Sequence, residues 1–183
     1  MTTPVALVEQ AKDGNREAFD VLAASVVDRL FAIARLVLRD ADRAEDAVQE
    51  TLVRCWRDLP ALRDPARFDG WLRRLLMNSV NDEFRRDRRH KANVRVLHAE
   101  PSVGDESGAV AAREQLDRGF QRLSVDHRAV LVLRLHLGLS IEETAASLGI
   151  PVGTAKSRLH YATEAMRLAL QADATPRAQE VSA

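Results

Sequence analysis

The sequence of 183 residues contains a single cysteine, Cys55. A lone cysteine excludes an internal disulfide framework and argues against a cysteine-rich zinc site. Its spacing places it on the apolar face of a predicted helix, which favours a packing role over a redox-sensing role. The five histidines are scattered without the spacing of metal ligands, so we expect no metal site and no cofactor.

Long apolar runs are absent as well. The stretch AVLVLRLHLGL is interrupted by Arg134 and His136, and it falls short of the ~20 apolar residues that a membrane-spanning helix needs. The start, MTTPVALVEQAKDG, lacks the basic region and apolar core of a secretory signal. We therefore expect a cytoplasmic protein with no membrane insertion.

Proline and glycine are few, 6 and 8 residues, and lie mostly outside the periodic stretches. The segment HAEPSVGDESGAVAA (98–112) is polar, small and acidic, as linkers are. The predicted fold class is therefore all-α: two small helical domains joined by a flexible linker, the C-terminal one carrying a helix-turn-helix. The predicted boundaries are 1–92 for the first domain, 93–112 for the linker, 113–172 for the second domain and 173–183 for a mobile tail.

Neither sign of charge is in excess, because 27 basic residues balance 27 acidic ones. An autonomous DNA-binding domain usually has a basic excess, since phosphate neutralisation dominates its affinity. Here the charges are segregated: residues 1–84 hold 12 basic and 15 acidic residues, whereas 85–96 hold 6 basic and 1 acidic. We expect the chain to bind DNA only weakly by itself.

Residues 139–162, LSIEETAASLGIPVGTAKSRLHYA, carry a helix-turn-helix pattern. Ser140 and Glu143 form a Ser-x-x-Glu capping box, which marks a helix start. Gly149 is expected to end that helix in a left-handed cap, and Pro151 prevents its continuation. Two short helices joined so tightly typically place the second one in the DNA major groove.

The second of these helices has an outer face of hydrogen-bond donors opposite an apolar stripe. Such donors can reach base edges or phosphates, and Arg158, nearer the buried side, suits a phosphate contact. An amphipathic hairpin with a solvated polar face is the alternative from this pattern alone. The candidate DNA-binding residues here are Thr154, Lys156, Ser157, Arg158, His160 and Tyr161.

Two further helical patterns carry candidate surfaces. The predicted helix over 42–58 has polar residues opposite its apolar stripe; a solvated face is the default, but dense acidic residues favour a docking surface. The predicted helix over 66–91 follows a proline-bounded loop (59–68) and carries a basic stripe. Capping of its C-terminus is the simple explanation, yet the arginines exceed that need, and a basic stripe beside Trp71 suits a nucleic-acid backbone with unstacked bases.

Three stretches resemble, in order, the conserved regions of bacterial sigma factors: AEDAVQETLVRCWRDL (44–59), FDGWLRRLLMNSVNDEFRRDRR (68–89) and LSVDHRAVLVLRLHLGLSIEETAASLGIPVGTAKSRLHYA (123–162). In its two-domain size and short linker, the chain resembles members of the extracytoplasmic-function group of the sigma-70 family. The resemblance implies core RNA polymerase and promoter DNA as partners, and an anti-sigma factor as regulator.

The resemblance also implies roles for individual residues. Those that match the core-polymerase-binding positions are Asp46, Gln49, Glu50 and Val53. Those that match the minus-ten promoter region, including the loop over 59–68 that captures a flipped base, are Arg67, Phe68, Trp71, Asn78, Asp82, Arg85, Arg86 and Arg89. The helix-turn-helix residues named above match the reader of the minus-thirty-five element. Tyr161 stands where a basic residue is frequent, which leaves the promoter sequence open.

Two other classes are alternatives. An autonomous helix-turn-helix repressor explains 139–162 but neither the acidic face over 40–50 nor the basic helix with its tryptophan. A structural helical adaptor leaves the outer face over 153–164 unexplained. An enzyme is not expected, because the sequence has no glycine-rich phosphate loop, activated-nucleophile signature or paired-carboxylate motif.

Overall fold

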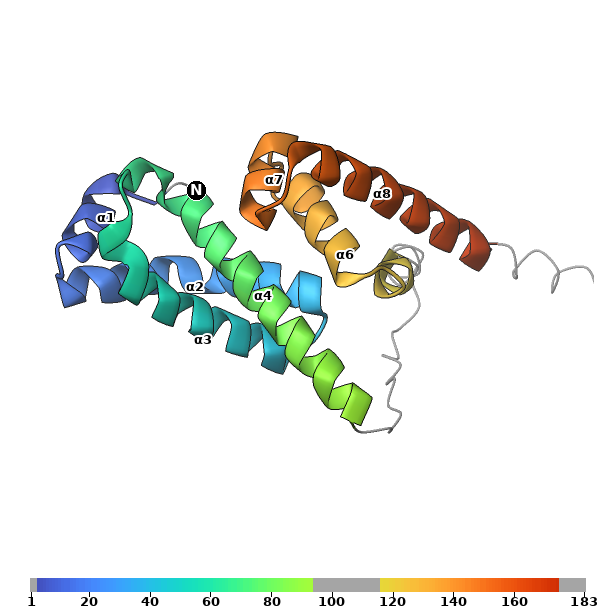
Figure 1. Cartoon of the computed structure of the whole chain (residues 1–183), viewed down its shortest axis with the longest axis horizontal. Helices are drawn as coiled ribbons and strands as arrows, with labels where there is room; N and C mark the ends of the chain where they lie inside the picture. The colour runs from blue at the N-terminus through green and yellow to red at the C-terminus, as the bar shows by residue number, and fades with distance from the viewer. Residues whose placement is uncertain (1–2, 94–115, 175–183) are drawn as a thin grey trace, which may run out of the picture.

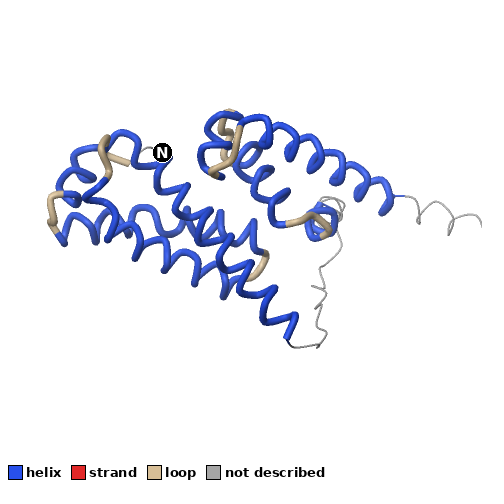
Figure 2. Tube along the Cα trace, in the orientation of Figure 1, coloured by secondary structure: helices blue, strands red, loops and turns tan. Residues whose placement is uncertain are grey.

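The computed structural model describes residues 3–93 and 116–174, and every regular element in these two ranges is helical (Figure 1, Figure 2). The helices form two groups, one from each range. The predicted all-α, two-part fold class is thereby confirmed. The predicted linker and tail fall almost wholly outside the described residues.

The N-terminal group contains four helices: α1 (Val5–Lys12), α2 (Arg16–Leu38), α3 (Ala41–Asp58) and α4 (Phe68–Asn93). Side chains at the helix starts fix two of these boundaries. Asn15 accepts a hydrogen bond from the Ala18 amide, and Asp40 accepts one from the Arg43 amide, so both satisfy donors that have no partner within the helix.

The segment between α3 and α4 is more regular than the predicted loop. It contains two short 3₁₀ turns, η1 (Leu59–Ala61) and η2 (Pro65–Arg67). A proline lies in each turn, at the position where its fixed φ and missing amide hydrogen cost least. Asp64 caps η2 by accepting a hydrogen bond from the Ala66 amide at 3.0 Å.

The core of the N-terminal group lies between α2, α3 and α4. Large side chains such as Leu22, Leu30, Leu72 and Leu76 are almost completely buried there. Cys55 is buried with them at 2 % exposure. Burial raises the pKa of its thiol to about 12, with a smaller contribution from the charge of Asp58, as expected of a packing residue.

The C-terminal group begins with helical residues 116–121, followed by α6 (Val125–Leu131), the π-helical turn η3 (Val132–His136), α7 (Ile141–Leu148) and α8 (Val152–Ala174). The predicted capping box is present, because Ser140 and Glu143 each bind the other's backbone amide. Gly149 ends α7 at φ 66°, in the left-handed region that glycine adopts without strain.

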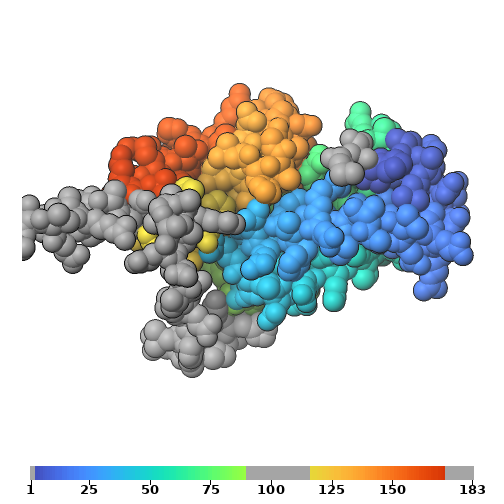
Figure 3. Space-filling view, turned by 180° about the vertical axis from the view of Figure 1, so that it is seen from behind, coloured from blue at the N-terminus to red at the C-terminus, as the bar shows by residue number. Residues whose placement is uncertain are grey.

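The two groups pack directly on each other. Figure 3 shows the surface of α7, in orange, meeting that of the N-terminal helices. Val125, Ala129 and Leu133 of the C-terminal group are buried in the same hydrophobic cluster as the N-terminal core. Residues of α4 contact α7, and residues of α2 contact α6. The sequence did not predict this closed arrangement.

Candidate functional site

The predicted docking face lies on α3 and is open to solvent. Asp46 and Gln49 are exposed, and the side chain of Val53 is 61 % exposed. Asp46, Gln49 and Val53 follow one another at spacings of three and four residues on α3, so they share one accessible face. Glu50 lies on the same face but is not free, since its carboxylate is held within the molecule.

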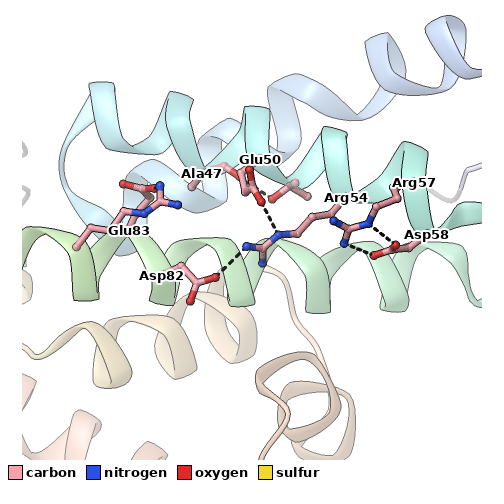
Figure 4. Close-up of polar contacts among 9 residues, drawn as sticks. Ala47, Glu50, Arg54, Arg57, Asp58, Asp82 and Glu83 are labelled. Atoms are coloured by element: carbon pink, nitrogen blue, oxygen red, sulfur yellow. Dashed lines mark hydrogen bonds and ion pairs between the residues drawn. The ribbon is translucent and has the colours of Figure 1, made fainter.

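The group that holds Glu50 is Arg54, one turn further along α3 (Figure 4). Its Nε donates to Glu50 Oε1 at 2.7 Å, and its Nη2 donates to Asp82 Oδ2 of α4 at 3.0 Å. These hydrogen bonds, first that to Glu50 and then that to Asp82, raise the pKa of the guanidinium above its ordinary value. The sequence analysis missed Arg54, although a Glu-to-Arg pair at i,i+4 is a readable signal.

The polar stripe of α4 continues beyond Asp82. Asn78, Arg85 and Arg89 are exposed, and Arg89 Nε donates to the Arg85 carbonyl at 3.3 Å. Arg86 is also accessible, but its guanidinium pairs with Glu83, a carboxylate that is 7 % exposed. This stripe offers several accessible cations to a phosphate backbone, while its acidic members are paired.

The structure corrects one expectation at the start of α4. Phe68 is 2 % exposed and is one of the largest fully buried side chains, so it packs in the core and is not available to contact DNA. Trp71, one turn on, is partly exposed, and its ring centroid lies 5.9 Å from that of Phe68. Arg67 is exposed and pairs with Asp64 at 3.2 Å. The buried ring of Phe68 therefore packs against the partly exposed ring of Trp71.

The predicted DNA-binding residues of the helix-turn-helix lie on the first turns of α8. Lys156, His160 and Tyr161 are exposed, and the rings of His160 and Tyr161 meet edge to face at 5.5 Å. Ser157 is exposed as well, and its hydroxyl donates to the Thr154 carbonyl at 3.0 Å. Its oxygen can still accept a hydrogen bond from a base or a water.

Arg158 differs from its neighbours on α8. Its Nη1 donates to Asp126 Oδ1 of α6 at 3.1 Å, and its side chain is 30 % exposed. Its position is nearer the buried side, as the spacing predicted. In this arrangement its guanidinium is paired with a carboxylate of its own domain.

A groove of about 770 Å³ brings residues of two predicted DNA-binding sets together. Asn78, Asp82 and Arg85 of α4 line one wall, and Arg158 of α8 lies on the other. A second recess of about 830 Å³ places Arg67 and Trp71 opposite residues of α7. None of the polymerase-binding candidates on α3 lines the first groove, but Arg54 of the same helix does.

Comparison with known proteins gives this arrangement its context. Residues 22–90 match Sigma-70 region 2, and residues 113–166 match Sigma-70, region 4. The chain is 40% identical over 147 residues to the ECF RNA polymerase sigma factor SigL of Mycobacterium tuberculosis (strain ATCC 25618 / H37Rv), covering 78% of this chain and 82% of that protein.

Two solved structures are similar over most of their length. One is CnrH in complex with the cytosolic domain of CnrY, with a TM-score of 0.65, 29% identity, and coverage of 92% of this chain and 97% of that chain. The other is the sigma factor RpoE in complex with the anti-sigma factor NepR from Bartonella quintana, with a TM-score of 0.62, 26% identity, and coverage of 85% and 98%.

The chain is all-α and combines a helix-turn-helix with a polar outer face, a basic helix and an acidic face, and it matches both sigma-70 regions. These features define a sigma factor, a protein that directs RNA polymerase to promoters. The chain belongs to the ECF RNA polymerase sigma factors. Family membership decides against the autonomous repressor and the structural adaptor. Among residues 3–93 and 116–174, no helix is long and apolar enough to span a bilayer.

Proposed function

We propose that the exposed face of α3 docks on core RNA polymerase, that α4 with the preceding turns contacts the minus-ten region, and that the first turns of α8 read the minus-thirty-five element. The domain boundaries that fit these tasks are 1–92 and 113–172, joined by residues 93–112 and followed by the tail 173–183. Core polymerase performs the chemistry, and this chain contributes recognition without a cofactor.

The observation that carries this proposal is the separation of charge over two faces. Asp46, Gln49 and Val53 present an acidic, partly apolar surface on α3, whereas Arg85 and Arg89 are accessible on α4. Acidic groups repel phosphates and attract a basic protein surface. The arginines attract phosphates and repel a basic protein surface. With a net charge of zero, the chain depends on the polymerase for much of its DNA affinity.

The closed arrangement has to open for promoter binding. The two promoter elements lie about 25 base pairs apart, which is on the order of 80 Å of duplex at ~3.4 Å per base pair. Asn78 and Arg158, however, line one groove, so they cannot reach both elements at once. The α4–α7 contact is therefore expected to separate when the chain joins polymerase and promoter.

A protein partner that controls this opening fits the closed arrangement. CnrH was solved with the cytosolic domain of CnrY, and RpoE with the anti-sigma factor NepR. We extend this to an anti-sigma factor for the present chain. The chain and its partners are expected to act in the cytoplasm, where the transcription machinery and promoter DNA are found.

The test compares DNA binding with and without core polymerase. Labelled promoter DNA is titrated with the purified chain alone, with core polymerase alone and with the two together. A stable, promoter-specific complex is expected only with both proteins. A tight, sequence-specific shift by the chain alone would contradict the proposal and favour a repressor.

A further inference from the structure

Arg54 touches both surfaces that the proposed function separates. Its guanidinium bridges Glu50 on the polymerase face of α3 and Asp82 on the DNA stripe of α4 (Figure 4). We propose that Arg54 is a positioning residue for promoter binding, which acts by holding and neutralising the Asp82 carboxylate beside the arginines of the α4 stripe. This inference rests on the proposed function.

The physical need arises from the place of Asp82 in the stripe. Its side chain is 41 % exposed, and it shares a groove with Asn78 and Arg85. An unpaired carboxylate there would repel the phosphates that the arginines attract, and partial desolvation on binding would strengthen that repulsion. The side chain of Arg54 is only 21 % exposed, so its guanidinium pairs with the neighbouring Asp82 carboxylate and is poorly placed to contact a phosphate of the DNA.

Glu50 completes the arrangement by aiming the guanidinium. Arg54 uses Nε for Glu50 and Nη2 for Asp82, two contacts in the fixed plane that only arginine provides. Lysine has one ammonium on a flexible stem, so it can supply the charge without the geometry. Glu50 on the polymerase face and Asp82 on the DNA stripe therefore share one cation.

A matched control lies three residues further along the same helix. Arg57 pairs with Asp58, its neighbour in sequence, and its side chain is 66 % exposed. The pair joins no second helix, and Arg57 does not line the groove that contains Asp82. Replacing Arg57 removes the same charge from α3 without leaving the Asp82 carboxylate unpaired.

The experiment is a double-mutant cycle on the complex with core polymerase. Affinity for melted-fork promoter DNA is measured at saturating core polymerase for Arg54→Gln and Arg57→Gln, each with Asp82 intact and in the Asp82→Asn background. Arg54→Gln is expected to weaken DNA binding about five- to tenfold with Asp82 intact and less than twofold in the Asp82→Asn background. Arg57→Gln should change it less than twofold in both, and Arg54→Lys should recover part of the loss.

Equal losses from Arg54→Gln in both backgrounds would overturn the inference, because Arg54 would then act directly on DNA or only through folding. No loss in either background would overturn it as well. The thermal unfolding curve of every variant is measured first, and DNA affinities are then compared at a temperature where all variants are folded. Failure of the proposed function is recognised separately, because the unmutated chain would then form no promoter complex with core polymerase.

Discussion

Reversing the charge of Asp46 should remove polymerase binding and leave the fold intact. Asp46 is exposed on the second turn of α3, which begins at Ala41, so its carboxylate contributes little to the dipole at the helix start. A lysine there lies one turn from Asp42 and Glu50, whose charges accommodate it. Exposed substitutions of this kind change stability by about 0.5 kcal/mol or less.

The effect on binding should be much larger. Two unit charges about 4 Å apart near a protein surface interact by about 4 kcal/mol at an effective dielectric constant of ~20, and salt and residual solvent reduce that value. Asp46→Lys replaces an attraction with a repulsion, so we expect a loss of about 2–4 kcal/mol. This corresponds to roughly 30- to 700-fold weaker binding.

The assay is a titration of core polymerase with fluorescently labelled chain at physiological ionic strength. Asp28→Lys is the control, because Asp28 is also exposed but lies on α2, away from the docking face, and the change in net charge is identical. Asp28→Lys should bind like the unmutated chain. If Asp46→Lys bound core polymerase with unchanged affinity, the assignment of the α3 face would be refuted.

Three further results are expected. Phe68→Ala should lower the free energy of unfolding by about 3–5 kcal/mol, measured by denaturant titration, because it empties a buried site; a change below 1 kcal/mol would contradict the assigned core position. In a promoter library transcribed at two salt concentrations, Ser157→Ala should change base preference at one position, whereas Arg86→Ala should weaken all promoters and flatten the salt dependence; the reverse pattern would show that the two roles are exchanged. The raised pKa of Cys55, about 12 against an ordinary 9.0, favours the neutral thiol in the folded state, so the stability it contributes is complete below pH 9 and is lost as pH rises towards 12; rapid alkylation of the folded chain at pH 8 would contradict its burial.

Local signals predicted where the first helix of the helix-turn-helix begins and ends, because the features that set helix ends are local. Asn15, Asp40 and Ser140 each cap a helix within three residues, and Gly149 adopts the left-handed conformation that its position demands. These effects depend on neighbours in sequence, so a single chain reveals them.

Contacts between distant residues could not be predicted in the same way. Phe68 and Trp71 are three residues apart at a helix start, and only the packing of α4 decides that the first is buried and the second accessible. The Arg54–Glu50 contact spans one helical turn and was readable. The Arg54–Asp82 contact spans 28 residues and depends on how α3 meets α4. The packing of α7 on α4 joins two helices separated by residues 94–140, with no local pattern to indicate it.

The most direct test of the central claim is run-off transcription by core polymerase, with and without this chain, on DNA fragments from the genome that encodes it. We predict discrete transcripts that require the chain, start at defined sites and disappear with Asp46→Lys but persist with Asp28→Lys. Unchanged transcription on adding the chain, or its repression, would contradict the identification of this protein's role in initiation.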